Sequence, residues 1–203
     1  MFGWKIDFLL IMERKIVRSV NTLLKAQGFK RKELAWNRVG SVFTQVIDLQ
    51  IAKHGSESFT INLGIFHPKI HMLCWEKPAP DFIREVDCLI RIRIGYLIGD
   101  KDCWWDILQN DDSDGIVDKI LGVIDNTVVP FFESIKSLAD VHRFVVENPQ
   151  SRIEYWLTDL QLAILKIEIG LKNDAIPLLR VLSKDKGLHD KIVKIAQLNH
   201  LQF

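Results

Sequence analysis

The segment Phe59 to Phe66 constrains the fold of this 203-residue chain most, because its residues alternate strictly in character. One side of the alternation is apolar and consists of Phe59, Ile61, Leu63 and Ile65, and the other side consists of Thr60, Asn62 and Gly64. A period of two is that of a β-strand with one face on a core. The second face carries a short amide and a glycine, where another element or a ligand can come close. We therefore predict a central strand here.

Three further segments have strand character, and short turns join the first two of them to each other and to the central strand. They are Leu34–Val39, Val42–Lys53 and Cys88–Ile98, and the turns fall at Gly40-Ser41 and at residues 54–58. The prolines at 68, 78 and 80 predict an irregular connection over residues 67–81, before the last strand. The pattern predicts an antiparallel meander.

Apolar residues at steps of three and four predict helices before and after these strands. The first helix ends at Gly28, and a second follows Ser113 or Asp114 as N-cap and is interrupted at Pro130. After Asn148-Pro149, a capping box of the form S-x-x-E at Ser151 opens a helical tail, with further helices over residues 173–183 and 189–201.

The predicted fold class is α+β. It has a four-stranded, largely antiparallel sheet with packed helices and an α-helical C-terminal extension. We assign residues 1–147 to the α+β domain and residues 148–203 to the extension packed on it.

The formal charge of +1, from 27 basic and 26 acidic residues, gives the whole molecule no attraction to nucleic acid or to an anionic membrane. The basic residues near the first helix end, Lys25 and residues 30–32, are interpreted as a solvated surface. Three cysteines without a C-x-x-C pair favour a reducing compartment. Asp7 interrupts the apolar N-terminal run, which argues against a signal peptide, so we expect a cytoplasmic protein.

Two short motifs resemble metal sites. His67, His71 and Cys74 have the spacing H-x3-H-x2-C, but no fourth ligand follows at a characteristic distance. Residues 110–115 resemble half of a calcium loop, yet its twelfth position is Leu121 instead of the bidentate Glu. We predict no metal and no cofactor. No P-loop, H-E-x-x-H or G-x-S-x-G motif occurs in the sequence, so we expect no enzyme.

A first candidate site is an acidic segment that contains two adjacent tryptophans. Its predicted partner-binding residues are Trp104, Trp105, Asp106, Asp111, Asp112 and Asp114. Aromatic side chains anchor protein contacts, and carboxylates steer a basic partner toward them. In the alternative interpretation, one or both tryptophans fill the core beside the sheet edge.

A second candidate site is the polar face of the sheet. Its predicted ligand-binding residues are Gln50, Asn62, Arg91, Arg93 and Arg38. Guanidinium groups suit carboxylate and phosphate, so this face could hold an anion or an acidic peptide. In the alternative interpretation, Asp48 pairs with an arginine across the sheet and the arginine stems cover apolar surface.

Several of these segments together resemble a bacterial family catalogued as domain of unknown function 4304. The resemblance covers Leu23 to Phe132 and is carried by Gly28-Phe29-Lys30, Trp36, residues 59–64, residues 91–95 and Trp104-Trp105. Residues 170–179 resemble one helical hairpin of a tetratricopeptide array, but no second copy is present, and such arrays need about three repeats.

The family resemblance implies a fold and not an activity. Because such small families often lie beside polymorphic toxin genes, it implies by analogy a role in immunity or defence. Our leading hypothesis is a non-enzymatic protein that neutralises a cognate toxin, with neither nucleic acid nor membrane as a partner. The alternative is a domain that binds a small molecule or nucleotide on the arginine-bearing sheet face.

Overall fold

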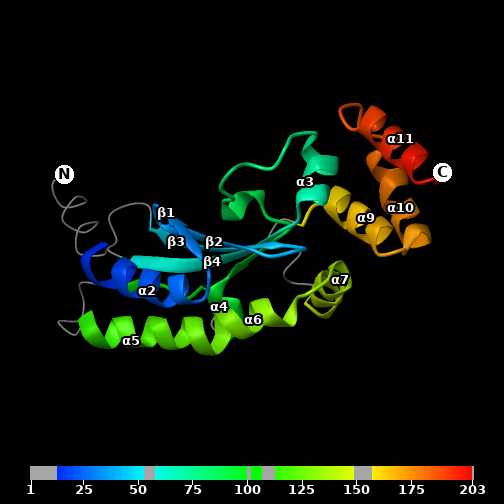
Figure 1. The fold of residues 1–203 in the computed structure, drawn as a ribbon. Coiled ribbons are helices and arrows are strands. Elements are labelled where there is room, and N and C mark those ends of the chain that lie inside the picture. Colours follow the sequence, from blue (N-terminus) through cyan, green and yellow to red (C-terminus); the bar gives the residue numbers. More distant parts are fainter. Residues whose placement is uncertain (1–12, 53–57, 100–101, 107–112, 149–156, 203) are drawn as a thin grey trace.

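The computed structural model describes residues 13–52, 58–99, 102–106, 113–148 and 157–202. Its centre is an antiparallel sheet (Figure 1). The strand order is β1-β2-β3-β4-β5, and β6 also pairs with β4. The strands are β1 (Lys30–Lys32), β2 (Ala35–Val39), β3 (Thr44–Ile51), β4 (Ser58–Phe66), β5 (Ile90–Arg93) and β6 (Trp105–Asp106). The α+β class and the meander are confirmed, but the described sheet has six strands instead of four. The two strands that the sequence did not predict are only three and two residues long.

The structure confirms the prediction for β4, because its apolar side faces the hydrophobic core. Phe59, Ile61, Leu63 and Ile65 are at most 1% exposed and belong to the main hydrophobic core. A helical layer covers this face (Figure 1). It contains α2 (Arg18–Ala26), which ends before Gly28 at φ 86°, and α5 (Ser113–Val123). Leu24, Ile120 and Phe132 bring these helices into the same core.

The helix that begins with α5 continues through Pro130 without a break. A π-helical segment, Ile124–Val128, follows α5, and α6 (Val129–Ser134) carries Pro130 in its first turn. Proline has no N–H and crowds the carbonyl four residues earlier in a regular α-helix. At this site the amide of Val129 bonds to the carbonyl of Ile124, so the wider turn absorbs the proline.

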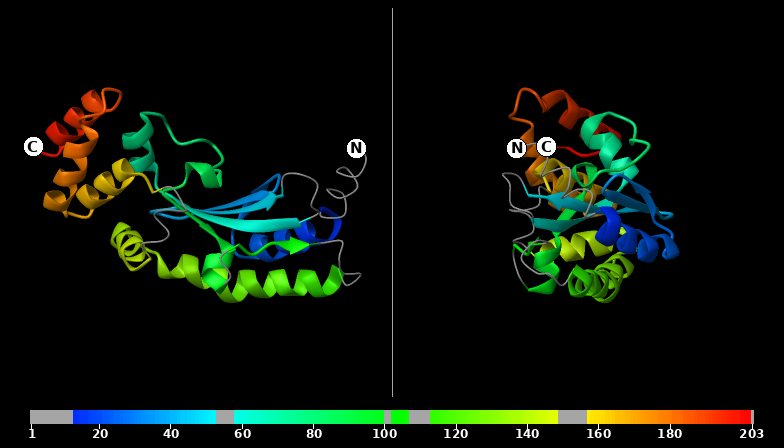
Figure 2. Two further views of the ribbon diagram at one scale, coloured as in Figure 1. Left: turned by 180° about the vertical axis from the view of Figure 1, so that it is seen from behind. Right: turned by 90° about the vertical axis from the view of Figure 1, so that its left-hand side faces the viewer.

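The C-terminal helices lie at one end of the sheet, beside α3 (Pro68–Trp75) and α7 (Leu138–Glu147) (Figure 2). They are α9 (Asp159–Glu168), α10 (Lys172–Leu182) and α11 (His189–Leu198). Thr158 and Gln161 form a capping box at the start of α9, and Gly170 follows its end at φ 86°. One hydrophobic cluster runs from α2 through the sheet to Ile192 of α11. None of the helices in the described ranges is both long and apolar enough to cross a membrane.

Two sequence predictions for residues 67–98 are wrong in detail. The predicted strand Cys88–Ile98 ends at Arg93, and α4 (Ile94–Ile98) follows it. Ile94, Leu97 and Ile98 are also spaced at three and four, so the same residues satisfy a helix that ends at Gly99 (φ 81°). The predicted irregular connection contains α3, with Pro68 in its first turn, where a proline is tolerated. The predicted capping box at Ser151 lies outside the described residues.

Candidate functional site

The polar face of the sheet is assembled from three neighbouring strands. Asp48 of β3 lies opposite Asn62 of β4, and Asn62 lies opposite Arg93 of β5. Gln50 and Arg91 stand two residues from Asp48 and Arg93, so period two puts them on the same face. The structure therefore brings together four of the five residues that the sequence assigned to a ligand face.

The fifth residue, Arg38, lies on the opposite face of the sheet. It is two residues from the buried Trp36 and therefore shares the core side of β2. Its Nε donates to Gln45 Oε1 at 2.6 Å, and its Nη2 donates to Glu133 at 2.6 Å. Its guanidinium carbon lies 4.9 Å from the ring centroid of Phe29. Arg38 thus joins β2 to the helical layer and forms no part of the polar face.

A continuous set of polar contacts crosses this face toward the sheet edge. Asn62 Nδ2 donates to Gln50 Oε1 at 2.8 Å, and Arg93 Nη2 approaches the same oxygen at 3.4 Å. Arg93 Nη1 donates to Asp102 Oδ1 in an ion pair. The Nε of Arg93 is buried and has no partner among the described residues. The arginine is therefore held by one carboxylate and one amide oxygen, next to solvent.

A segment over residues 76–89 covers the other half of the polar face. The Asn37 side chain makes two hydrogen bonds to the backbone of Ile83, both at 2.8 Å. Arg84 pairs with Glu33, and its Nη1 lies 3.6 Å from Asp48 Oδ2. Arg91 pairs with Glu85. Carboxylates of the chain thus neutralise the arginines of this half, but Asp48 approaches Arg84 of the covering segment instead of the predicted arginine across the sheet.

Asp48 titrates unusually within this network. Burial raises its pKa to about 6, and the nearby Glu85 acts in the same direction, while Arg84 opposes the shift. At neutral pH the structure therefore holds a carboxylate whose charged form is disfavoured by its surroundings.

The two adjacent tryptophans have different environments. Trp105 is 5% exposed and lies on Phe59, with ring centroids 5.6 Å apart, so it fills the core beside the sheet edge. Trp104 is partly exposed, and its indole nitrogen donates to Asp102 Oδ1 at 2.9 Å. The Arg93 guanidinium lies 5.2 Å from the centroid of the Trp104 ring. Only Trp104 is placed to meet a partner.

The structure joins the two sites that the sequence predicted separately. Asp102 accepts hydrogen bonds from Arg93 of the polar face and from Trp104 of the acidic segment through one oxygen atom. We call Arg93, Asp102 and Trp104 the Asp102 cluster. Asp102 was not among the predicted partner-binding residues. Its position two residues before Trp104 could have indicated that it belongs to the same site.

The remaining predicted partner-binding residues do not lie together in one described site. Asp106 is partly exposed in β6, opposite Ser58. Asp114 lies in the first turn of α5, where its side chain is not described. Asp111 and Asp112 lie outside the described residues.

The residues of the H-x3-H-x2-C motif cap α3 and pack it against the rest of the protein. His67 is the N-cap, and its Nδ1 accepts from the Ile70 amide at 3.3 Å. His71 lies against Phe66, with ring centroids 5.2 Å apart. Cys74 is buried, which raises the pKa of its thiol to about 12. Across the described ranges, no group of three His, Cys, Asp or Glu side chains is arranged to hold a metal ion.

Comparison with known proteins gives one match. No curated protein and no solved structure matches this chain significantly. A family model described as a domain of unknown function (DUF4304) matches residues 20–134, which span most of α2, the six described strands and the helical layer up to α6. This range contains the Asp102 cluster and the whole polar face, and it ends before the C-terminal helices. The chain therefore belongs to the DUF4304 family.

Proposed function

We propose that this protein is a non-enzymatic binding protein of the immunity type, which neutralises a cognate bacterial toxin by covering its active site. The observation that carries the proposal is the Asp102 cluster at the sheet edge. It combines a partly exposed tryptophan, a carboxylate and a guanidinium, and tryptophan and arginine are enriched among the residues that contribute most to binding at protein interfaces.

The charge balance of the polar face favours a protein partner over a small anion. Arg91 is paired with Glu85, and Arg93 with Asp102. An anion would have to displace a carboxylate of the protein to reach either guanidinium, which costs the existing ion pair. This argues against the alternative function, the binding of a small molecule or nucleotide on this face.

Asp102 is prepared to receive a cationic group. Its side chain is 65% exposed, and both of its hydrogen bonds use Oδ1. Among the described residues, none donates to Oδ2. Because Arg93 and Trp104 already fix the carboxylate, a partner loses little side-chain entropy when it binds there. We expect a lysine or arginine of the toxin at this position, in the cytoplasm of a bacterium.

The proposal is tested first by affinity purification of the tagged protein from its host, with mass spectrometry of the bound proteins. We expect one stoichiometric partner that is toxic when expressed alone. Trp104→Ala should weaken its binding by about 2 kcal/mol, and Asp102→Asn by about 1 kcal/mol, as measured by calorimetry.

Asp118→Asn is the matched control, because Asp118 is an exposed carboxylate on α5, which packs on the opposite face of the sheet. It should bind like the wild type. If Trp104→Ala and Asp118→Asn bind the partner equally well, the Asp102 cluster is not the interface. If no partner is recovered and a metabolite raises the melting temperature of the wild type but not of Arg93→Ala, the alternative function is correct.

A further inference from the structure

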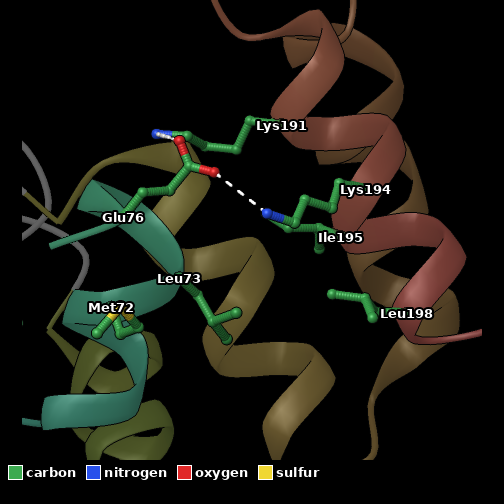
Figure 3. A pocket seen from close by; sticks show the side chains of 7 residues that line it. All are labelled: Met72, Leu73, Glu76, Lys191, Lys194, Ile195 and Leu198. Atoms are coloured by element: carbon green, nitrogen blue, oxygen red, sulfur yellow. Dashed lines mark ion pairs between the residues drawn. The ribbon is translucent and has the colours of Figure 1, made fainter.

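A groove lies between α3 and α11, at the end of the molecule that carries the C-terminal helices (Figure 3). Its volume is about 280 Å³, and its apolar lining is Met72, Leu73, Ile195 and Leu198. Pockets that enclose a drug-sized ligand have about 300–1,000 Å³. The groove is thus smaller than a typical metabolite site and suits a few inserted side chains.

One apolar residue on each wall of the groove remains open to solvent. Met72 is 45% exposed and Leu198 is 64% exposed. Trp75, one helical turn beyond Met72 on α3, is 52% exposed. Neighbouring exposed apolar side chains on one surface are a mark of an interaction site. The groove therefore has the character of a docking surface for another macromolecule.

The charges at the rim are unbalanced. Glu76 lies 3.8 Å from Lys191 Nζ and 3.6 Å from Lys194 Nζ, so one carboxylate serves two ammonium groups (Figure 3). Lys191 also donates to the Cys74 carbonyl at 2.7 Å and holds the end of α3. Lys194 is 67% exposed and has Glu76 as its ion-pair partner. The lining therefore carries one net positive charge, on the side of Lys194.

We propose that this groove binds an amphipathic helix of another protein, with leucine-like side chains inserted between α3 and α11 and a carboxylate paired with Lys194. Two helices that flank an apolar groove are a known way of binding a third, whose side chains are spaced at three and four residues. The partner's carboxylate would neutralise the positive charge that remains because Glu76 alone pairs with both Lys191 and Lys194. This site goes beyond the proposed toxin contact.

The groove and the Asp102 cluster lie at opposite ends of β4. The cluster adjoins β6, which pairs with Ser58 and Phe59, whereas α3 begins two residues after Phe66. Nine residues of extended chain span about 30 Å. A substitution in the groove therefore leaves the cluster intact, and the two proposals fail independently.

The test uses a fluorescent peptide of about 16 residues that forms an alanine-based helix, with leucines on one face and flanking glutamates. A second peptide has lysine in place of every glutamate. We expect the full-length protein to bind the acidic peptide at least about tenfold more tightly than the basic one in fluorescence anisotropy, with a difference that shrinks as salt is added. Lys194→Glu should reverse the preference.

Leu198→Asp and Val181→Asp form a matched pair. Leu198 and Val181 are 64% and 63% exposed, both lie in the last turn of a helix, and only Leu198 lines the groove. Leu198→Asp should weaken acidic-peptide binding at least about tenfold and Val181→Asp should not change it. Equal binding by both variants, or equal affinity of the wild type for both peptides, would refute the proposal. If sedimentation shows a wild-type dimer that Leu198→Asp dissociates, the groove binds a second copy of this chain instead.

Discussion

Gly64 is one of the points where the segment over residues 76–89 contacts the sheet. A Cβ atom at this position would lie 2.4 Å from Cys88 Sγ and 3.0 Å from Cys88 Cβ. Because Cys88 is 3% exposed, neither side has room to move. Gly64→Ala should lower the free energy of unfolding by about 1–3 kcal/mol in urea denaturation, through overpacking.

The control for this prediction is Gly122→Ala in α5. Here the nearest atom to the new Cβ is Asn126 Nδ2, at 3.9 Å. Alanine favours a helix interior over glycine, so this variant should be stabilised by up to about 1 kcal/mol. The explanation fails if Gly64→Ala is as stable as wild type, or if Cys88→Ala in the same chain recovers none of the loss.

Asp48 should make the stability of the protein depend on pH. Its folded pKa of about 6 lies above its ordinary value of 3.8, so between these values the folded state binds more protons than the unfolded state. The free energy of unfolding therefore falls as pH rises through this window, because charging the buried carboxylate costs energy.

Asp48→Asn removes this dependence. The stability of the variant relative to wild type should rise by about 2 kcal/mol between about pH 4.5 and about pH 7.5, since each pKa unit corresponds to about 1.4 kcal/mol and the folded pKa of about 6 lies about 1.5 units above pH 4.5. Urea denaturation of both proteins at the two pH values measures the difference. Parallel pH profiles would show that burial does not shift this carboxylate.

At the residue scale, the sequence could not decide which of the two adjacent tryptophans is buried. Trp104 and Trp105 point to opposite sides, so the answer depends on how β6 pairs with β4. The register sets Trp105 opposite Phe59, on the core face. A strand of two residues has no periodicity of its own from which this could be predicted.

The predictions for whole elements succeeded where one period dominated. β4 was predicted from strict alternation, and α10 was predicted as a helix over residues 173–183. α9 lies within the predicted helical tail, but its N-cap is Thr158 and not the predicted Ser151. They failed where two periods fit the same residues, as at Ile94–Ile98, and where prolines suggested a loop although one of them begins α3. Likewise, the polar face was predicted from strand parity, whereas its cover over residues 76–89 depends on tertiary contacts such as that of Asn37 with Ile83.

The capping box of α9 gives a prediction at the same scale. Thr158 Oγ1 accepts from the Gln161 amide at 3.1 Å, and Gln161 Oε1 accepts from the Thr158 amide at 2.9 Å. Thr158→Ala should cost about 1 kcal/mol in urea denaturation. Thr22→Ala on the exposed side of α2 is the control and should change stability by less than about 0.5 kcal/mol. Equal effects would mean that the cap contributes nothing.

The whole molecule should unfold in one step, because its hydrophobic cluster continues from the sheet into α10 and α11. Leu179 of α10 is fully buried, so Leu179→Ala should cost about 2–5 kcal/mol. If the extension unfolds together with the sheet, the urea midpoint of Leu179→Ala should fall below that of wild type by the same amount in far-UV circular dichroism and in the fluorescence of Trp36 and Trp105.

This comparison is best made with Trp156→Phe in both proteins, so that no tryptophan follows residue 148. A midpoint that falls in circular dichroism alone would show that the extension unfolds separately from the sheet.

The meander also determines the order in which the chain can fold. β1 to β4 each pair with their neighbour in sequence, and Glu33-Leu34 and the four residues 40–43 are the only links between β1, β2 and β3. Such local contacts need little loop-closure entropy, so these strands can pair early. All described strands precede residue 107, and α11 comes more than eighty residues later. During synthesis from the N-terminus, the sheet is therefore complete before the second wall of the groove leaves the ribosome.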